Sequence, residues 1–333
     1  MKTLIIAEVG VNHNGDIEKA KELIDIASES GADIVKFQTF KAESLVTRDA
    51  PRAQYQIKNT GNLDSQFEML KKLELSKESF VELSSYCSKK RIEFLSTGFD
   101  KESLDFLINI GIKRVKIPSG EINNLPLLKH IAGIGLPIIL STGMCLLKEV
   151  EETMNFLIKE GVEKNKITIL HCTSQYPAPV ESVNLQAMIT MKELFNVKVG
   201  YSDHTLNNET PIAAVSMGAT IIEKHFSLSR SMDGPDHAAS LEPNELKQMI
   251  NSIRTTEMLI GSDEKKPTDI EKDNIQVVRK SIVAKKNIPL GKYIEESDLN
   301  TKRPGNGLSP MLWDDIIGTK AKREYKEDDQ IIL

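Results

Sequence analysis

The feature that most constrains the fold of this chain is a regular alternation of two kinds of segment. Short runs rich in β-branched and other apolar residues have the length of buried strands, and they occupy residues 3–10, 33–39, 92–97, 114–121, 137–143, 167–173, 197–203 and 220–226. Between them lie longer segments with the apolar spacing of amphipathic helices, such as residues 17–30, 77–90 and 147–161. This alternation is typical of a parallel sheet whose strands are joined by helices.

Eight strand and helix units in roughly 260 residues match the size of a (β/α)8 barrel. We therefore predict an α/β fold with a TIM barrel over residues 1–260. The charged stretch 261–278 is interpreted as a linker, and residues 279–333, with short strands and Pro and Gly turns, as a small mostly-β domain. A domain of about 55 residues is marginal alone, so we expect it to pack on the barrel or on a second chain.

The predicted strands end in polar side chains, and a TIM barrel has its active site at the C-terminal strand ends. The candidates are Glu8, Lys36, Gln38, Ser96, Thr97, Lys116, Ser119, Glu121, Ser141, Thr142, Thr173, Ser174, Tyr176, Ser202, Asp203, His204 and His225. A single polar residue can simply mark the start of a loop. Lys36, Lys116 and His225 instead interrupt or follow apolar runs, where an unpaired charge is costly. Together the strand ends predict a polar pocket.

Lysines and Ser/Thr-Gly turns at this mouth predict an anionic, phosphorylated substrate. The turns at residues 118–121, 141–144 and 201–205 can present backbone N–H groups and a hydroxyl to phosphate oxygens. Each turn alone is equally well explained by helix capping. Their convergence with Lys36 and Lys116 favours phosphate binding.

His204 and His225 end neighbouring predicted strands, so their imidazoles can converge on one divalent metal ion. Period-2 alternation puts Glu223 on the same face as His225 and turns Lys224 toward the helices. His13, His130 and His171 are interpreted as structural residues.

The carboxylates at the mouth, Glu8 and Glu121, are candidates for acid–base catalysis or for holding sugar hydroxyls. Glu121 would also suit charge compensation at a helix N-terminus.

Two segments interrupt the regular rhythm near the same mouth. Residues 41–75 form a long insertion between the second and third strands, and residues 227–243 are rich in turn residues. Insertions at this point of a barrel often cover the active site, so we expect the first to act as a lid.

Charge and composition exclude several classes of protein. A net charge of −5 argues against a nucleic-acid partner, and no apolar run is long enough to predict a membrane span or a signal peptide. Three cysteines without CxxC spacing fit a reducing compartment, so we expect a cytoplasmic protein.

The chain resembles the sialic acid synthase family along nearly its whole length. The matching stretches are AEVGVNHNGD, KFQTFKA, KIPSGE, ILSTGM, LHCTSQYPAP, YSDHT, EKHF, GPDHAAS and KRPGNG, in chain order. The last 55 or so residues resemble the antifreeze-like (SAF) module that ends these enzymes. Two residues depart from the family pattern: Ser174 stands where relatives often have Asn or Thr, and Gly98 stands where they frequently have Pro.

The resemblance implies condensation of phosphoenolpyruvate with an N-acetylated mannosamine-type sugar to a nine-carbon keto acid, with release of phosphate. It implies a divalent metal on His204 and His225, foremost Mn2+, with Mg2+ or Co2+ as alternatives. The phosphoenolpyruvate ligands would be Lys36, Thr97, Lys116, Ser119, Ser141, Ser174 and Ser202, and the sugar ligands Glu8, Gln38, Tyr176 and Asp236. Glu121 is the expected base that activates water, with Glu8 as its rival and Lys116 as a further catalytic residue.

The resemblance also implies a homodimer in which the C-terminal domain of one subunit caps the barrel of its partner. Arg303, in the KRPGNG turn, would then reach the sugar of the partner subunit's site. Reciprocal capping of this kind gives two-fold symmetry.

Several functions stay open at this point. N-acetylneuraminate synthase leads, and N,N'-diacetyllegionaminate synthase, which uses a diacetamido-trideoxymannose, is the nearest alternative. A Schiff-base aldolase with Lys36 or Lys116 as nucleophile is a second mechanism. A non-catalytic sugar- or ice-binding protein is a third class.

Overall fold

The computed structural model describes residues 2–333, which form two compact units. The first ends at Gly261, and the second comprises Ser262–Leu333. Each unit has its own hydrophobic core. None of the helices over residues 2–333 combines the length and the apolar composition needed to cross a bilayer.

The first unit is built on eight parallel strands: β1 (Leu4–Gly10), β2 (Ile34–Thr39), β3 (Glu93–Gly98), β4 (Val115–Ile117), β5 (Ile138–Ser141), β6 (Ile167–Cys172), β7 (Lys198–Asp203) and β8 (Ile221–His225). Their order in the sheet is β3-β2-β1-β8-β7-β6-β5-β4, and the two end strands, β3 and β4, are in contact. This is the strand order of a barrel. The predicted TIM barrel is therefore confirmed.

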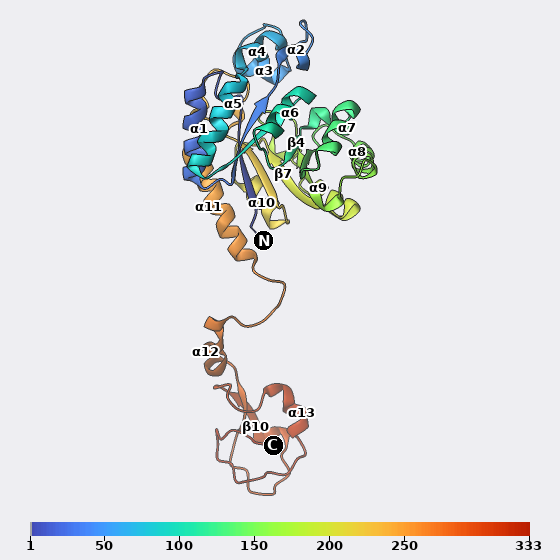
Figure 1. Cartoon of the computed structure of the whole chain (residues 1–333). Helices are drawn as coiled ribbons and strands as arrows, with labels where there is room; N and C mark the ends of the chain where they lie inside the picture. The colour runs from blue at the N-terminus through green and yellow to red at the C-terminus, as the bar shows by residue number, and fades with distance from the viewer. Residues whose placement is uncertain (1) are drawn as a thin grey trace. The chain divides into compact units, whose positions relative to one another are not determined.

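Helices follow the strands and cover the outside of the sheet: α1 (Ile17–Ser30), α5 (Lys77–Lys90), α6 (Lys101–Asn109), α7 (Leu125–Ile134), α8 (Leu147–Lys159), α9 (Gln186–Phe195), α10 (Glu209–Ser216) and α11 (Pro243–Ile260) (Figure 1). Helix α1 illustrates why these segments are helical. Asp16 caps its first turn, Gly31 ends it with a φ of 87°, and Ala20, Leu23, Ile24 and Ala27 form its buried stripe. Such stripes pack on the outward side chains of the strands and form the main core.

Inward side chains of the strands form layers, because alternate residues point to opposite faces. The apolar layer comprises Ile6, Ile34, Leu95, Ile139, Leu170 and Ile221. Gly200 contributes no side chain because a Cβ there would collide with the Ile221 carbonyl and Leu170. Two residues further along, most of the inward positions are polar: Glu8, Lys36, Thr97, Ser141, Ser202 and Glu223. The apolar layer thus seals the barrel below the site.

The insertion folds into three short helices: α2 (Ala42–Leu45), α3 (Gln54–Thr60) and α4 (Gln66–Leu73), which lie together at one end of the barrel (Figure 1). A capping box starts α4, with the Ser65 hydroxyl accepting from the Glu68 N–H. Apolar side chains of α2 and α4 pack with Val11 and Phe40 in a separate small core.

The second unit contains α12 (Asp269–Val278), the antiparallel strands β9 (Ser281–Ala284) and β10 (Leu299–Lys302), and the short helix α13 (Trp313–Ile316). Its core includes Ile282, Leu299 and Tyr325. Helix α12 occupies part of the stretch interpreted as a linker. A Thr268–Glu271 capping box starts it, and none of its residues is buried.

Candidate active site

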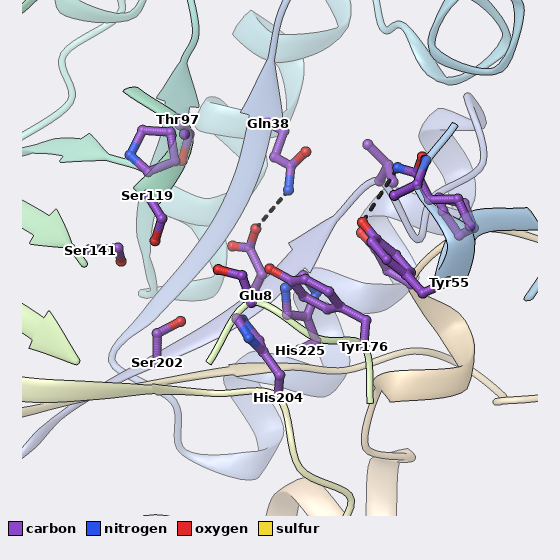
Figure 2. A pocket seen from close by; sticks show the side chains of 18 of the residues that line it. Glu8, Gln38, Tyr55, Thr97, Ser119, Ser141, Tyr176, Ser202, His204 and His225 are labelled. Carbon is purple, nitrogen blue, oxygen red and sulfur yellow. Dashed lines mark hydrogen bonds between the residues drawn. The ribbon is translucent and has the colours of Figure 1, made fainter. Parts of the chain in front are cut away.

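A cavity of about 580 Å³ opens at the C-terminal ends of the barrel strands. It is large enough for two small substrates. Its lining brings together nearly all the predicted site residues of the barrel: Glu8, Lys36, Gln38, Thr97, Lys116, Ser119, Ser141, Ser174, Tyr176, Ser202, His204, His225 and Asp236 (Figure 2). Residues far apart in sequence therefore meet in one site, as the strand-end pattern predicts.

Five of the strand-end candidates do not line the cavity: Glu121, Ser96, Thr142, Thr173 and Asp203. Glu121 is not among the lining residues; it ends a 3-10 turn after β4, and its carboxylate accepts a 2.6 Å hydrogen bond from the Asn124 amide. Of the two carboxylates expected at the mouth, only Glu8 faces the cavity. Arg303 belongs to the second unit, where it is exposed.

The floor of the cavity is a buried cluster of two lysines and two carboxylates. The Lys36 ammonium lies 2.7 Å from Glu8 Oε2 and 3.6 Å from Glu223 Oε2, while the Lys116 ammonium lies 3.3 Å from Glu223 Oε1. All four side chains are at most 5% exposed. Charges buried this deeply are tolerated only when each is paired with an opposite charge.

The two carboxylates of this cluster differ in proton affinity. Burial raises the pKa of Glu223, but Lys116, Lys36 and a 3.0 Å hydrogen bond from Ser202 outweigh it and bring that pKa to about 2. Burial dominates at Glu8 and, despite Lys36, raises its pKa to about 7. Glu223 is therefore a permanent anion between the lysines. Glu8 can gain or lose a proton near neutral pH.

Hydroxyl groups line the cavity beside the lysines. Ser119 Oγ accepts a 2.8 Å hydrogen bond from the Gly143 N–H. A Cβ at Gly143 would collide with Ser174 Oγ, so this turn requires glycine. Ser141 Oγ is buried and has no hydrogen-bond partner among the described residues, which leaves it free for a ligand.

His204 and His225 lie side by side at the rim, with ring centroids 5.6 Å apart. His204 Nδ1 is 2.6 Å from the Thr173 carbonyl, so this nitrogen carries the proton and Nε2 presents its lone pair. His225 Nδ1 has no partner among the described residues. Burial lowers the pKa of both imidazoles, most strongly at His225, and keeps them in the neutral form that binds metals.

This pair fits a divalent metal as two nitrogen donors. Within residues 2–333 no cluster of three or more His, Cys, Asp or Glu side chains forms a complete metal site. Water or substrate oxygens would therefore supply the remaining positions.

Tyr176 connects the histidines to the insertion. Its ring lies 4.1 Å from the His204 ring and 4.9 Å from the Tyr55 ring. Asp236, from the turn-rich segment after β8, is buried nearby in the cavity wall, and burial raises its pKa to about 6. Tyr55 is a lining residue that the sequence did not single out.

The insertion supplies other lining residues that the sequence reasoning missed: Ala53, Gln54, Gln56, Gln66, Met69, Leu70 and Leu73. The available signal was the spacing of residues 66, 69, 70 and 73, which is that of one helix face. The insertion was expected to act as a lid; in this structure it forms a wall of the cavity. Closure remains a prediction.

Asp203 and Lys224 point away from the cavity. The Lys224 ammonium lies 2.5 Å from Asp203 Oδ2, and both side chains are fully buried. Lys224 therefore has the structural position expected from strand alternation. Asp203 pairs with Lys224 and does not belong to the cavity lining.

Comparisons with known proteins are consistent with this geometry. The chain matches the NeuB family model over residues 23–265 and the SAF domain model over residues 279–331. It is 52% identical to the N,N'-diacetyllegionaminic acid synthase of Campylobacter jejuni over 330 residues, 99% of each chain. It is 49% identical to the enzyme of that name from Legionella pneumophila, over 96% of this chain and 90% of that one.

Among solved structures, the N-acetylneuraminic acid synthetase of Leptospira borgpetersenii, crystallised with citrate, superposes with a TM-score of 0.73 and 33% identity. The match covers 83% of this chain and 90% of that one.

Proposed function

The chain belongs to the NeuB family and carries a C-terminal SAF domain, and we propose that it joins phosphoenolpyruvate to an N-acetylated aldose. The observation that carries this proposal is one cavity in which two buried lysines and several hydroxyl groups adjoin a neutral histidine pair. The first group suits an anionic enol phosphate, and the second suits a metal-bound carbonyl.

The product that we propose is N,N'-diacetyllegionaminate. Identities of 52% and 49% to two synthases of this name, over nearly the full chain, support it. From the sequence alone, N-acetylneuraminate synthase ranks first and N,N'-diacetyllegionaminate synthase second. We now reverse that order.

For phosphoenolpyruvate we propose that Lys36 and Lys116 bind the phosphate and carboxylate, assisted by hydroxyls of Thr97, Ser119, Ser141, Ser174 and Ser202. The buried, unpartnered Ser141 hydroxyl supports this assignment. Glu223 would hold both lysines in place before the ligand arrives, since it lies within 3.6 Å of each ammonium group.

His204 and His225 would hold a divalent metal, Mn2+ foremost and Mg2+ or Co2+ as alternatives, which when bound would polarise the sugar aldehyde. The fixed proton on His204 Nδ1 orients the Nε2 lone pair for this task. Tyr176 packs against both imidazoles and limits their motion.

The reaction has two parts in which this chain's residues act. Carbon 3 of the enolpyruvate attacks the aldehyde carbon, and water then adds to the cationic carbon 2 before phosphate leaves. We propose Glu8 as the group that takes the proton from this water. Its position in the cavity and its pKa of about 7 support it over Glu121.

The remaining sugar contacts that we propose are Gln38, Tyr176 and Asp236 from the same chain. Arg303 would come from the partner subunit of a homodimer whose C-terminal domains are exchanged. The exposure of Arg303 within the second unit supports its availability to a second chain.

The test is phosphate release from phosphoenolpyruvate by the full chain with added Mn2+, using N-acetylmannosamine or the diacetamido-trideoxymannose. We expect release with the second sugar at the higher kcat/KM. Release with neither would reject the proposal. Covalent trapping of a lysine by borohydride, with full activity under a chelator, would instead support a Schiff-base aldolase.

A further inference from the structure

The cavity has a second face that the proposed reaction does not use. Figure 2 shows Thr97, Ser119, Ser141 and Ser202 on one side and Tyr55 on the other, with the histidines and Tyr176 between them. The second side comes from the insertion, and we name its lining residues the insertion face: Ala53, Gln54, Tyr55, Gln56, Gln66, Met69, Leu70 and Leu73. None of these residues carries a charge.

Helix α4 turns one side toward the cavity. Gln66, Met69, Leu70 and Leu73 all line it, at the spacing i, i+3, i+4 and i+7. The three apolar members pack with Val11 and Phe99, which also line the cavity. The result is a continuous apolar wall with a glutamine at its start.

Helix α3 adds amide groups to this wall. Gln54 and Gln56 line the cavity beside Tyr55, and Asn59 ties the helix to the segment that carries Asp236 through a 2.8 Å hydrogen bond to the Pro235 carbonyl. Gln56 uses its amide within the helix, where its Oε1 accepts from the Ala53 N–H and its Nε2 donates to the Tyr55 hydroxyl. The side-chain amides of Gln54 and Gln66 can donate to and accept from an acetamido group, and apolar carbons can contact its methyl. The insertion face therefore matches amide and methyl groups better than hydroxyls.

Its distance from the histidines fits the far end of an open-chain sugar. The Tyr176 ring lies 4.1 Å from the His204 ring and the Tyr55 ring lies 4.9 Å from the Tyr176 ring, both pairs being tilted, so the insertion face begins two rings away from the proposed aldehyde position.

We infer that the insertion face selects the sugar. It receives the terminal methyl of a diacetamido-trideoxyhexose and the acetamido group at the far end from the aldehyde. This rests on the proposed function. A hydroxymethyl end in the same place would lose water without gaining a full set of hydrogen bonds against Met69, Leu70 and Leu73. Discrimination by one such group in an apolar pocket is typically about 10- to 200-fold.

The test compares kcat/KM for the diacetamido-trideoxymannose and for N-acetylmannosamine in Met69→Gln and Leu70→Asn. We expect each variant to lower the ratio of the two values roughly tenfold or more, through KM of the diacetamido sugar. KM for phosphoenolpyruvate should stay within about twofold, because its proposed ligands lie on the opposite face. Leu63→Asn is the matched control, since Leu63 belongs to the same insertion but is 83% exposed.

A third variant covers the case in which the apolar positions do not tolerate polar side chains. Gln66→Glu puts a carboxylate on the same face at the first position of α4, where the helix N-terminus favours it. It should also lower the ratio. An unchanged ratio in the variants that fold would overturn the inference and leave the proposed function intact, whereas wild-type protein inactive with both sugars would reject the proposed function itself.

Discussion

The two faces of the cavity are built in opposite ways. On the strand-end face, charged and hydroxyl side chains come from several barrel strands, and Lys36, Glu8 and Glu223 form a buried ionic cluster. On the insertion face, uncharged side chains come from two short helices, and Met69, Leu70 and Leu73 belong to a small separate core. This barrel therefore carries the charged side chains of the cavity on its strands and the uncharged ones on an added segment.

The physical reason lies in how each support fixes its side chains. Neighbouring strands hold Glu8 beside Lys36 and beside His225 through backbone pairing. These closely spaced charges form ion pairs in the buried interior. A substitution that removes one of them leaves its partner as an uncompensated buried charge. A helix face of uncharged residues can change its shape without that penalty. Substitutions should therefore affect catalysis on the first face and substrate choice on the second.

The largest effect should come from the histidine pair. His225→Ala or His204→Ala should lower kcat roughly 10³-fold or more, because Lewis-acid stabilisation is worth several kcal/mol. A chelator should have the same effect on the wild type, reversed by added Mn2+. His130→Ala is the control, since His130 lies on the outside and pairs with Asp105. Full activity in the presence of chelator would refute the metal role.

Glu8 tests which carboxylate handles the proton. Glu8→Gln should lower kcat about 10²- to 10⁴-fold, the usual range for a positioned acid–base group. In the wild type a base with a pKa of about 7 is protonated below that value. Activity should therefore rise with pH through about 7, and this limb should vanish in the variant. If Glu121→Gln produces the larger loss and the altered pH profile, Glu121 is the base.

Arg303 tests whether a second chain completes the site. Arg303→Ala should raise KM for the sugar about 10- to 100-fold, the range for losing a charge-assisted hydrogen bond. Mixing inactive His225→Ala subunits with Arg303→Ala subunits should restore part of the activity if chains exchange. Arg323→Ala is the control within the same unit. Unchanged sugar kinetics in Arg303→Ala would argue against the exchanged dimer.

Ser141 should give the smallest effect on the strand-end face. Ser141→Ala should raise KM for phosphoenolpyruvate about tenfold, because a single hydrogen bond from a hydroxyl to a charged ligand group contributes about 1.5 kcal/mol. Thermal stability should not fall, since the hydroxyl has no partner within the described chain. A clear loss of stability without any change in KM would show that this hydroxyl serves the fold.

The barrel and most of the strand-end face could be predicted from local sequence patterns. Strand period is a local property, so the alternation of Ile221, Glu223 and His225 against Ile222 and Lys224 could be predicted from spacing alone. Parallel strands bring their C-terminal ends to one mouth, so spacing alone predicts that His204 and His225 lie together, as they do.

Tertiary structure decided what lies beyond the strands. In the turn after β4, the Glu121 carboxylate accepts a hydrogen bond from the Asn124 amide and does not face the cavity. The ion pair of Asp203 with Lys224 keeps a second carboxylate out of the site. The inner face of α4 is set by its packing on Val11 and Phe99. These outcomes depend on contacts between segments distant in sequence, whereas strand alternation is fixed by neighbouring residues. That is why most of the strand-end face could be predicted and the insertion face could not.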